Sequence, residues 1–205
     1  MILGVGHPCT GTGYTAKTLQ KSGLKVGHER VAVHGIVSWA LAAPLPVGKR
    51  IPFTTGLKSG VVPWDSAKVI HVARNPVDSL NSVVAEDNTP ARAHRLRHLE
   101  NCNGDAVHDA MESMVQWAEF CKSKNPGIIY RVDVPDDNDL LSDFLGVEIR
   151  PWNTNYNSKR RSKKFNYNRG DILSQNSELV DRFINLCLYF GYEDEASILE
   201  IGRIN

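Results

Sequence analysis

Short apolar runs alternate with longer stretches of helical composition along this chain. The clearest run is Val69–Ala73, which is followed by Arg74 and Pro76. An apolar run of about five residues that ends near a Pro predicts a buried strand. Because Pro cannot continue a strand ladder but suits the first turn of a helix, we expect a helix to begin near Pro76.

The same patterns predict the other elements. Further strands are expected at Ile2–Val5, Leu24–Val26 and Ile128–Val132, and helices at Thr15–Lys21, Ser79–Ala85, Ala91–Leu99, Asp105–Lys122, Asn138–Leu145 and Leu179–Tyr189. The apolar run Ile36–Ala43 has helix-like composition, and residues 44–65 contain four prolines, typical of a long irregular connection. Strands that alternate with helices predict an α/β fold with a mainly parallel sheet, in a single domain over residues 1–205.

Composition and charge exclude several classes of protein. A chain of 205 residues with 41% apolar residues can bury a substantial core. The balance of 24 Lys and Arg against 23 Asp and Glu leaves no overall field that would favour nucleic acid or an anionic membrane. No apolar run approaches the roughly 20 residues of a membrane helix, and the first strand begins directly after Met1, where a signal peptide would lie. Any anion site must therefore be local.

The four cysteines, Cys9, Cys102, Cys121 and Cys187, lie far apart and lack the spacing of metal ligands. We therefore expect free thiols in the reducing cytoplasm and no bound metal.

A glycine-containing loop, Gly6-His-Pro-Cys-Thr-Gly-Thr-Gly-Tyr14, follows the first predicted strand and precedes a predicted helix. A strand, a glycine loop and a helix in this order can cradle a phosphate, although a generic tight turn is an alternative. ATP and GTP hydrolases place Lys and then Ser or Thr after the second glycine. This chain has Thr12 and Gly13 there, which argues against such a hydrolase.

A second anion site is predicted where the strand Val69–Ala73 ends. Arg74 lies at its carboxyl end, next to the start of a helix, and Ser82 lies further along that helix. Free N–H groups at the helix start, the positive end of the helix dipole and a guanidinium all favour a bound phosphate.

Three further features are candidates for the site. Glu29 follows a predicted strand on the side where ligands bind in open α/β sheets, with a surface pair to Arg30 as the alternative. His34 is a second catalytic candidate, although a lone histidine is more often structural. Residues 157–169 contain many cations and no acid, so this segment is either solvated or closes over a bound polyanion, with Phe165 or Tyr167 available to stack on a base.

The segment Arg74-Asn-Pro-x-Asp-Ser-x-x-Ser82 resembles the 3′-phosphate signature of sulfotransferases that use 3′-phosphoadenosine 5′-phosphosulfate (PAPS). Pro8-Cys-Thr-Gly-Thr12 resembles their 5′-phosphosulfate loop, usually Pro-Lys/Arg-Ser-Gly-Thr-Thr. Gly27-His-Glu29 resembles the Gly-Glu-Glu of tyrosylprotein sulfotransferases, whose second Glu is the catalytic base. Tyr130-Arg-Val-Asp133 is similar to the family's Arg-Tyr-Glu-Asp strand. The resemblance covers residues 1–133 in pieces, and beyond them only the basic segment resembles the family's carboxyl-terminal nucleotide-binding loop.

The resemblance implies a P-loop-like three-layer α/β/α fold. It also implies transfer of a sulfuryl group from PAPS to a hydroxyl or amine of a small molecule, glycan or peptide, with adenosine 3′,5′-bisphosphate as product and no metal. Glu29 would be the base. The residues that would bind the nucleotide are Cys9, Thr10, Gly11, Thr12, Gly13, Tyr14, Arg74, Ser82, Lys163, Lys164 and Arg169.

Cys9 departs from the family pattern, which has Lys or Arg on the bridging oxygen at this position. Either Lys17, Arg30 or the basic segment supplies the charge, or the protein is a slow enzyme or a nucleotide-binding relative without turnover. A P-loop kinase of small molecules is a third alternative, which the missing Lys after Gly11 opposes. The acceptor would be selected by residues 44–65 and by the helices after Ser82, neither of which carries a chemical signature.

Overall fold

The computed structural model describes residues 1–55, 57–86, 89–102, 104–152 and 166–204. The chain divides into two compact units. The first comprises Met1–Ala73 and Glu119–Tyr156, and the second comprises Arg74–Ala118 and Asn157–Asn205. Each unit is described separately below, and the interpretation of the chain as a single domain stays a prediction.

The first unit contains a parallel sheet of five strands in the order β2-β3-β1-β4-β5. Leu3 in the central strand lies opposite Ile36 on one side and Val69 on the other. The strands are β1 (Ile2–Gly6), β2 (Val26–His28), β3 (Gly35–Val37), β4 (Lys68–Ala73) and β5 (Ile128–Arg131). The expected α/β class is confirmed, and the helices that flank the sheet are consistent with a three-layer α/β/α fold.

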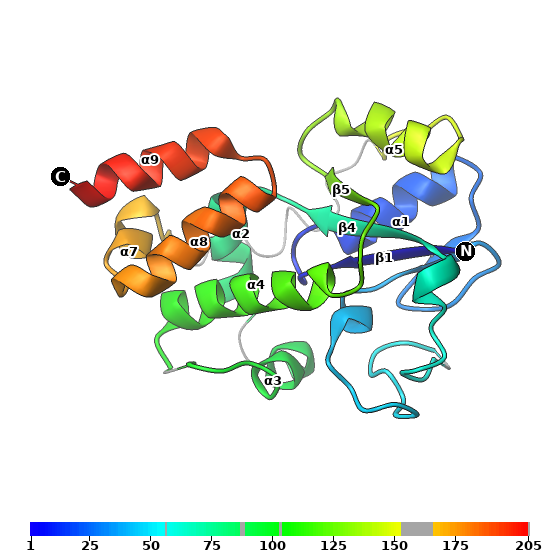
Figure 1. Cartoon of the computed structure of the whole chain (residues 1–205), viewed down its shortest axis with the longest axis horizontal. Coiled ribbons are helices and arrows are strands. Elements are labelled where there is room, and N and C mark those ends of the chain that lie inside the picture. The colour runs from blue at the N-terminus through cyan, green and yellow to red at the C-terminus, as the bar shows by residue number, and fades with distance from the viewer. Residues whose placement is uncertain (56, 87–88, 103, 153–165, 205) are drawn as a thin grey trace. The chain divides into compact units, whose positions relative to one another are not determined.

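Two helices of the first unit, α1 (Thr12–Lys21) and α5 (Asp137–Leu145), pack with the sheet into one apolar cluster. Leu19 of α1 and Leu141 of α5 are fully buried there with Ile70 of β4. Figure 1 shows both helices on the same side of the strands. Since apolar burial stabilises roughly in proportion to area, this cluster holds the strand ends that carry the site.

The expected helix at Ile36–Ala43 is wrong. The segment forms the buried strand β3 and then a short 3-10 helix, η1 (Trp39–Ala42), and Ser38 between them accepts a hydrogen bond from the Ala40 N–H at 3.2 Å. Strand β3 lies between β2 and β1, so all its side chains are buried and no alternation marks it as a strand. A short continuous apolar run cannot be told from a helical segment by its pattern alone.

Residues 44–65 form the irregular connection that the prolines predict, apart from a short 3-10 helix, η2 (Trp64–Ser66). Within this connection the chain folds back on itself. The Gly48 N–H donates to the Ser59 carbonyl, and the Ser59 N–H donates to the Lys49 carbonyl, each at 2.8 Å.

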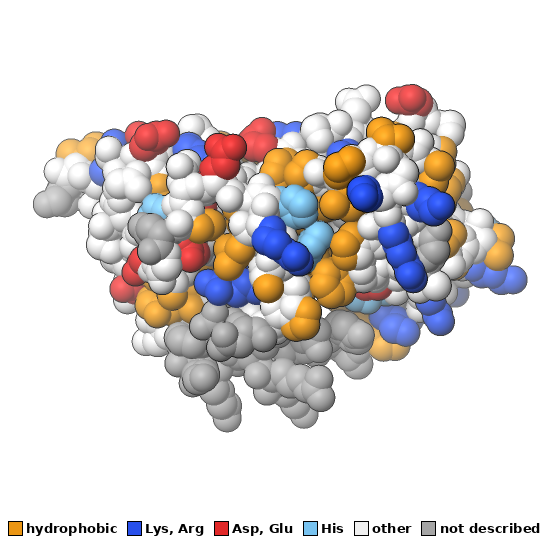
Figure 2. Space-filling model, turned by 90° about the horizontal axis from the view of Figure 1, so that it is seen from below, with side chains coloured by type: hydrophobic (Ala, Val, Ile, Leu, Met, Phe, Trp, Pro, Cys, Tyr) orange, Lys and Arg blue, Asp and Glu red, His pale blue; other side chains and the backbone are white. Residues whose placement is uncertain are grey.

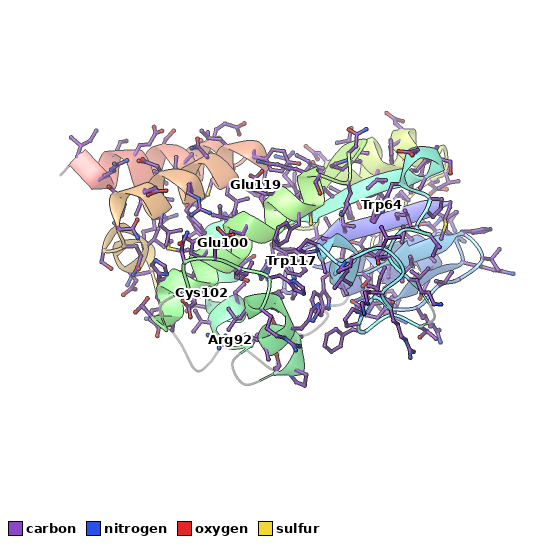
Figure 3. All side chains as sticks on the ribbon, turned by 60° about the horizontal axis from the view of Figure 1, so that its bottom comes forward. Trp64, Arg92, Glu100, Cys102, Trp117 and Glu119 are labelled. Carbon is purple, nitrogen blue, oxygen red and sulfur yellow. The ribbon has the colours of Figure 1, made fainter. Side chains whose placement is uncertain are left out.

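The second unit is helical throughout the part that the structure describes. Its helices are α2 (Pro76–Val84), α3 (Pro90–Leu96), α7 (Arg169–Leu173), α8 (Ser177–Tyr189), α9 (Glu193–Ile204) and α4 (Ala106–Lys122), whose last turn belongs to the first unit. Buried ion pairs join them: Arg95 lies 2.7 Å from Glu86, and the Arg92 guanidinium, labelled on α3 in Figure 3, lies 3.7 Å from Asp109 of α4.

None of the helices in the described ranges combines the length and the apolarity needed to cross a bilayer.

Candidate functional site

The glycine loop connects β1 to α1 and is fastened from below by Thr10. The Thr10 side chain is 1% exposed, and its hydroxyl lies 2.6 Å from the carbonyl oxygen of His7 and 3.2 Å from that of Val72 in β4. The Thr10 N–H also donates to His7. The predicted nucleotide-binding residue Thr10 is therefore engaged by the protein, and it fixes the shape of the loop against the neighbouring strand.

Gly11 leaves the start of α1 open. It is the N-cap residue, with a φ of 103°, no side-chain cap follows, and the first turn contains no acidic residue. A Cβ on Gly11 would lie 2.7 Å from a methyl group of Val132, so both backbone conformation and space require glycine. Uncapped N–H groups and the helix dipole make this end of α1 suitable for an anion.

Cys9 adopts a left-handed conformation, with a φ of 74°, on the same loop. A non-glycine residue pays of the order of 1 kcal/mol or more for this conformation, so the loop holds the thiol position under strain. Lys17, in α1, lies close enough to His28 for its charge to contribute to lowering the pKa of that imidazole. Lys17 is therefore the cation of the first unit with a demonstrated electrostatic effect near the loop.

Glu29 directly follows β2 and is also left-handed, with a φ of 57°. Its carboxylate accepts hydrogen bonds from the Ser38 hydroxyl and the Trp39 N–H. These bonds favour the ionised form, but burial outweighs them and raises the pKa of Glu29 to about 7. A carboxyl group with such a pKa is suited to accept a proton at neutral pH.

His28 connects Glu29 to the loop. Its Nε2 atom lies 3.4 Å from Oε1 of Glu29 and 3.5 Å from Oγ1 of Thr12, the first residue of α1. Oε1 of Glu29 is buried and makes no hydrogen bond within the described residues. Burial, and then Lys17, lower the pKa of His28 and favour the neutral imidazole. The structure thus brings the predicted base and the predicted phosphate loop together.

His34 lies elsewhere. It directly precedes β3, and its Nδ1 atom accepts a hydrogen bond of 2.8 Å from the Lys25 N–H, just before β2. Because the strands are parallel, this position is at the amino edge of the sheet, whereas Glu29 and the loop are at the carboxyl edge. The structure does not bring His34 together with the other predicted catalytic residue.

Arg74 and Ser82 belong to the second unit, at the start of α2 and almost two turns into it. Asn75 caps the helix by accepting a hydrogen bond of 3.0 Å from the Val77 N–H. Arg74 is partly buried, and within the described residues no ion pair or side-chain hydrogen bond engages its guanidinium. The guanidinium is therefore available for an anion at this helix start.

The end of the basic segment is anchored to α2. Asn81 donates from its amide to the carbonyl of Tyr167 at 2.9 Å and accepts from the Tyr167 N–H at 2.8 Å. Arg169 pairs with Glu195 at 2.8 Å, so its guanidinium would have to leave that carboxylate to reach a phosphate. The other two predicted cations of this segment, Lys163 and Lys164, lie outside the described residues.

Sequence reasoning missed Ser38 and His28 as parts of the site. Ser38 is fully buried and fixes the Glu29 carboxylate, a role that depends on β3 lying beside β2. His28 carries a weak signal, because it stands between the glycine and the glutamate of the Gly27-His-Glu29 motif.

In the described ranges, no group of three or more His, Cys, Asp or Glu residues could hold a metal ion. Comparisons of this chain with protein-family models, with curated proteins and with solved structures found no match.

Proposed function

We propose that this chain is a sulfotransferase that moves a sulfuryl group from PAPS to a hydroxyl group of a small molecule, glycan or peptide. The observation that supports this most is the position of His28, within 3.5 Å of both Thr12 at the phosphate loop and Glu29. A sulfuryl transfer needs a base beside the group that moves, and this arrangement places a carboxyl group of raised pKa there.

In the proposed reaction, the oxygen of the acceptor hydroxyl attacks the sulfur atom of PAPS in line with the leaving phosphate. The hydroxyl proton passes to Glu29, a new S–O bond forms, and the bond from sulfur to the bridging oxygen breaks. Adenosine 3′,5′-bisphosphate leaves with the electron pair of that bond. Charge that develops on its 5′-phosphate would be stabilised by the N–H groups at the start of α1.

Arg74 and Ser82 are proposed to hold the 3′-phosphate, the group that distinguishes this donor from ATP. The unengaged guanidinium of Arg74 and the start of α2 support this role. Arg169 and the lysines at 163 and 164 would close over the nucleotide, and Glu195 would release Arg169 when they do. His34 has no role in this proposal.

A second candidate function is a PAPS-binding protein without turnover, and Cys9 favours it. A thiol cannot supply the positive charge that the resembling family has on the bridging oxygen, which is worth about 3–4 kcal/mol if it acts like other oxyanion donors. Lys17 is the residue we expect to compensate, since its charge already acts on His28.

The four free cysteines support a reducing compartment such as the cytoplasm as the place of action. The experiment that separates the two functions is a transfer assay with PAPS and a panel of phenols, sugars and tyrosine peptides. Sulfated product together with adenosine 3′,5′-bisphosphate supports the enzyme, whereas tight binding of the bisphosphate without product supports the binding protein.

A further inference from the structure

Phe53 is held in a conformation that an ordinary packing residue has no reason to adopt. In the described part of the first unit, the non-glycine residues with positive φ are Cys9, Glu29, Phe53 and Asn125. Asparagine tolerates this region, but the other three are strained. Two of those three belong to the site proposed above. Because strained residues cluster at functional sites, the third, with a φ of 59°, calls for a functional explanation.

The backbone around Phe53 is fixed by its neighbours. Thr54, 5% exposed, donates to the carbonyl of Ile51 from its hydroxyl at 2.8 Å, and the Ile51 N–H donates to the carbonyl of Leu57 at 2.9 Å. This turn presents the Phe53 ring outward, where the residue remains 44% exposed. The strain therefore maintains an exposed aromatic ring instead of filling the core.

The ring of Phe53 lies against Trp39, with the ring centroids 5.2 Å apart and the planes inclined by 39°. Trp39 is the residue whose N–H donates to the Glu29 carboxylate. The turn that carries Phe53 also reaches Glu29 directly, because the Thr55 N–H donates to the Glu29 carbonyl at 3.3 Å. Two independent connections thus place the aromatic pair next to the proposed base.

The surrounding segment is positively charged. Residues 30–64 contain Arg30, Lys49, Arg50 and Lys58 and no Asp or Glu. All four cations are exposed, and on the face that Figure 2 shows, Lys and Arg side chains are visible over the sheet-containing unit. A ligand that contacts this segment is favoured if it carries negative charge.

We propose that Phe53, stacked on Trp39, is the residue that selects the acceptor of the reaction. It takes the flat face of the ring that bears the acceptor hydroxyl, and the cations around it favour a negatively charged compound. This inference rests on the proposed function, because it assigns the acceptor side of the same site. The competing explanation is that Phe53 only covers Trp39.

The substitution Phe53→Gly separates the two explanations. It removes the ring and also relieves the positive φ, so a selecting residue can be lost with the melting temperature unchanged or raised. A covering residue would instead lower the melting temperature when removed. Phe53→Tyr keeps a flat ring, Phe53→Leu keeps apolar volume without one, and Val61→Ala changes an apolar residue that is 67% exposed on the same connection.

The test measures binding and turnover with 4-hydroxyphenylacetate, with tyramine as the same ring bearing a positive charge and 6-hydroxyhexanoate as an anionic alcohol without a ring. Binding is followed by calorimetry on the full chain, with and without adenosine 3′,5′-bisphosphate. We expect 4-hydroxyphenylacetate to bind most tightly. Phe53→Gly and Phe53→Leu should raise its Kd and KM about tenfold or more, and Phe53→Tyr and Val61→Ala should leave them nearly unchanged.

Each outcome has a definite meaning. Unchanged binding of 4-hydroxyphenylacetate in Phe53→Gly overturns the inference, as does a lower melting temperature with all ligands weakened together. Equal binding of the three probes by the unaltered protein overturns it as well. A protein that binds 4-hydroxyphenylacetate through Phe53 but does not bind the bisphosphate contradicts the proposed function and leaves a ring-binding surface. A protein that binds the bisphosphate and forms product with Phe53 replaced at no cost contradicts only this inference.

Discussion

Nε2 of His28 lies 3.4 Å from Oε1 of Glu29, the buried carboxylate oxygen for which the described residues provide no hydrogen bond. The same nitrogen lies 3.5 Å from the hydroxyl of Thr12, so one imidazole connects the carboxyl group to the start of α1. Unsatisfied buried polar atoms are rare in folded proteins and often indicate a functional role. In the proposed reaction, the missing partner of Oε1 is the proton of the acceptor hydroxyl.

Replacing Glu29 by Gln should reduce turnover without weakening nucleotide binding. Glutamine keeps an oxygen for the Ser38 and Trp39 donors but cannot take a proton, so kcat should fall by about 10²–10⁴-fold, the usual contribution of a general base. Steady-state kinetics and calorimetry with adenosine 3′,5′-bisphosphate measure the two effects. Glu148→Gln, which changes an exposed carboxylate of the same unit, is the matched control. Full activity in Glu29→Gln would remove Glu29 from the mechanism.

Glu29 should also make the protein less stable as the pH rises. Its pKa is about 7 in the folded protein and near 4.5 when unfolded, so the folded state binds more protons between these values. The free energy of unfolding therefore falls as the pH increases through this window, by an amount of the order of 2–3 kcal/mol. Denaturant unfolding at pH 4.5 and pH 8 should show Glu29→Gln gaining stability over the unaltered protein at pH 8 only. An equal difference at both pH values would show that the pKa is not raised.

His71 should have the opposite effect on stability in acid. It is buried in β4, and burial, and then the charge of Lys122, lower its pKa to about 3. The unfolded chain then binds a proton below pH 6.5 that the folded protein refuses, which costs on the order of 2 kcal/mol of stability by about pH 5. The NMR signals of the His71 ring should not titrate between pH 8 and pH 5, and a midpoint near its ordinary value would contradict this prediction.

Replacing Cys9 by Lys tests whether a cation is missing from the loop. If Lys17 compensates only in part, Cys9→Lys should raise kcat, by up to about 10²-fold if the new charge acts like an oxyanion donor. Cys9→Gly is the control, because it relieves the positive φ of this position without adding charge, and it should stabilise the protein with turnover unchanged. Turnover that rises equally in both variants would assign the effect to backbone strain.

The strands that the sequence predicts best are those whose apolar runs are bounded by clear breaks. Val69–Ala73 ends before Arg74 and Pro76, and the observed strand, Lys68–Ala73, differs by one residue. Strand β3 could not be predicted in this way because it is short and buried on both faces, and its apolar run continues into η1. Helix α9 was also missed, since only Ala196 and Leu199 are buried along it and its apolar pattern is weak.

The site shows the same limit. Glu29 and the glycine loop could be proposed from their positions after predicted strands, because parallel strands bring their carboxyl ends to one edge. Ser38 and Phe53 could not, since their relation to Glu29 depends on a strand pairing and on a turn that no local pattern indicates. The positive φ of Phe53 is likewise invisible in the sequence, because phenylalanine rarely adopts it.

The most direct test of the account is a calorimetric titration with adenosine 3′,5′-bisphosphate and with ADP, on the unaltered protein and on Arg74→Ala. We predict that the bisphosphate binds at least about tenfold more tightly than ADP, because only the bisphosphate has the phosphate that Arg74 is proposed to hold. Removing this charged hydrogen-bonding partner should weaken the bisphosphate by roughly 10–100-fold and leave ADP unchanged. A protein that binds ADP as tightly as the bisphosphate, or that binds the bisphosphate equally well without Arg74, would contradict the account.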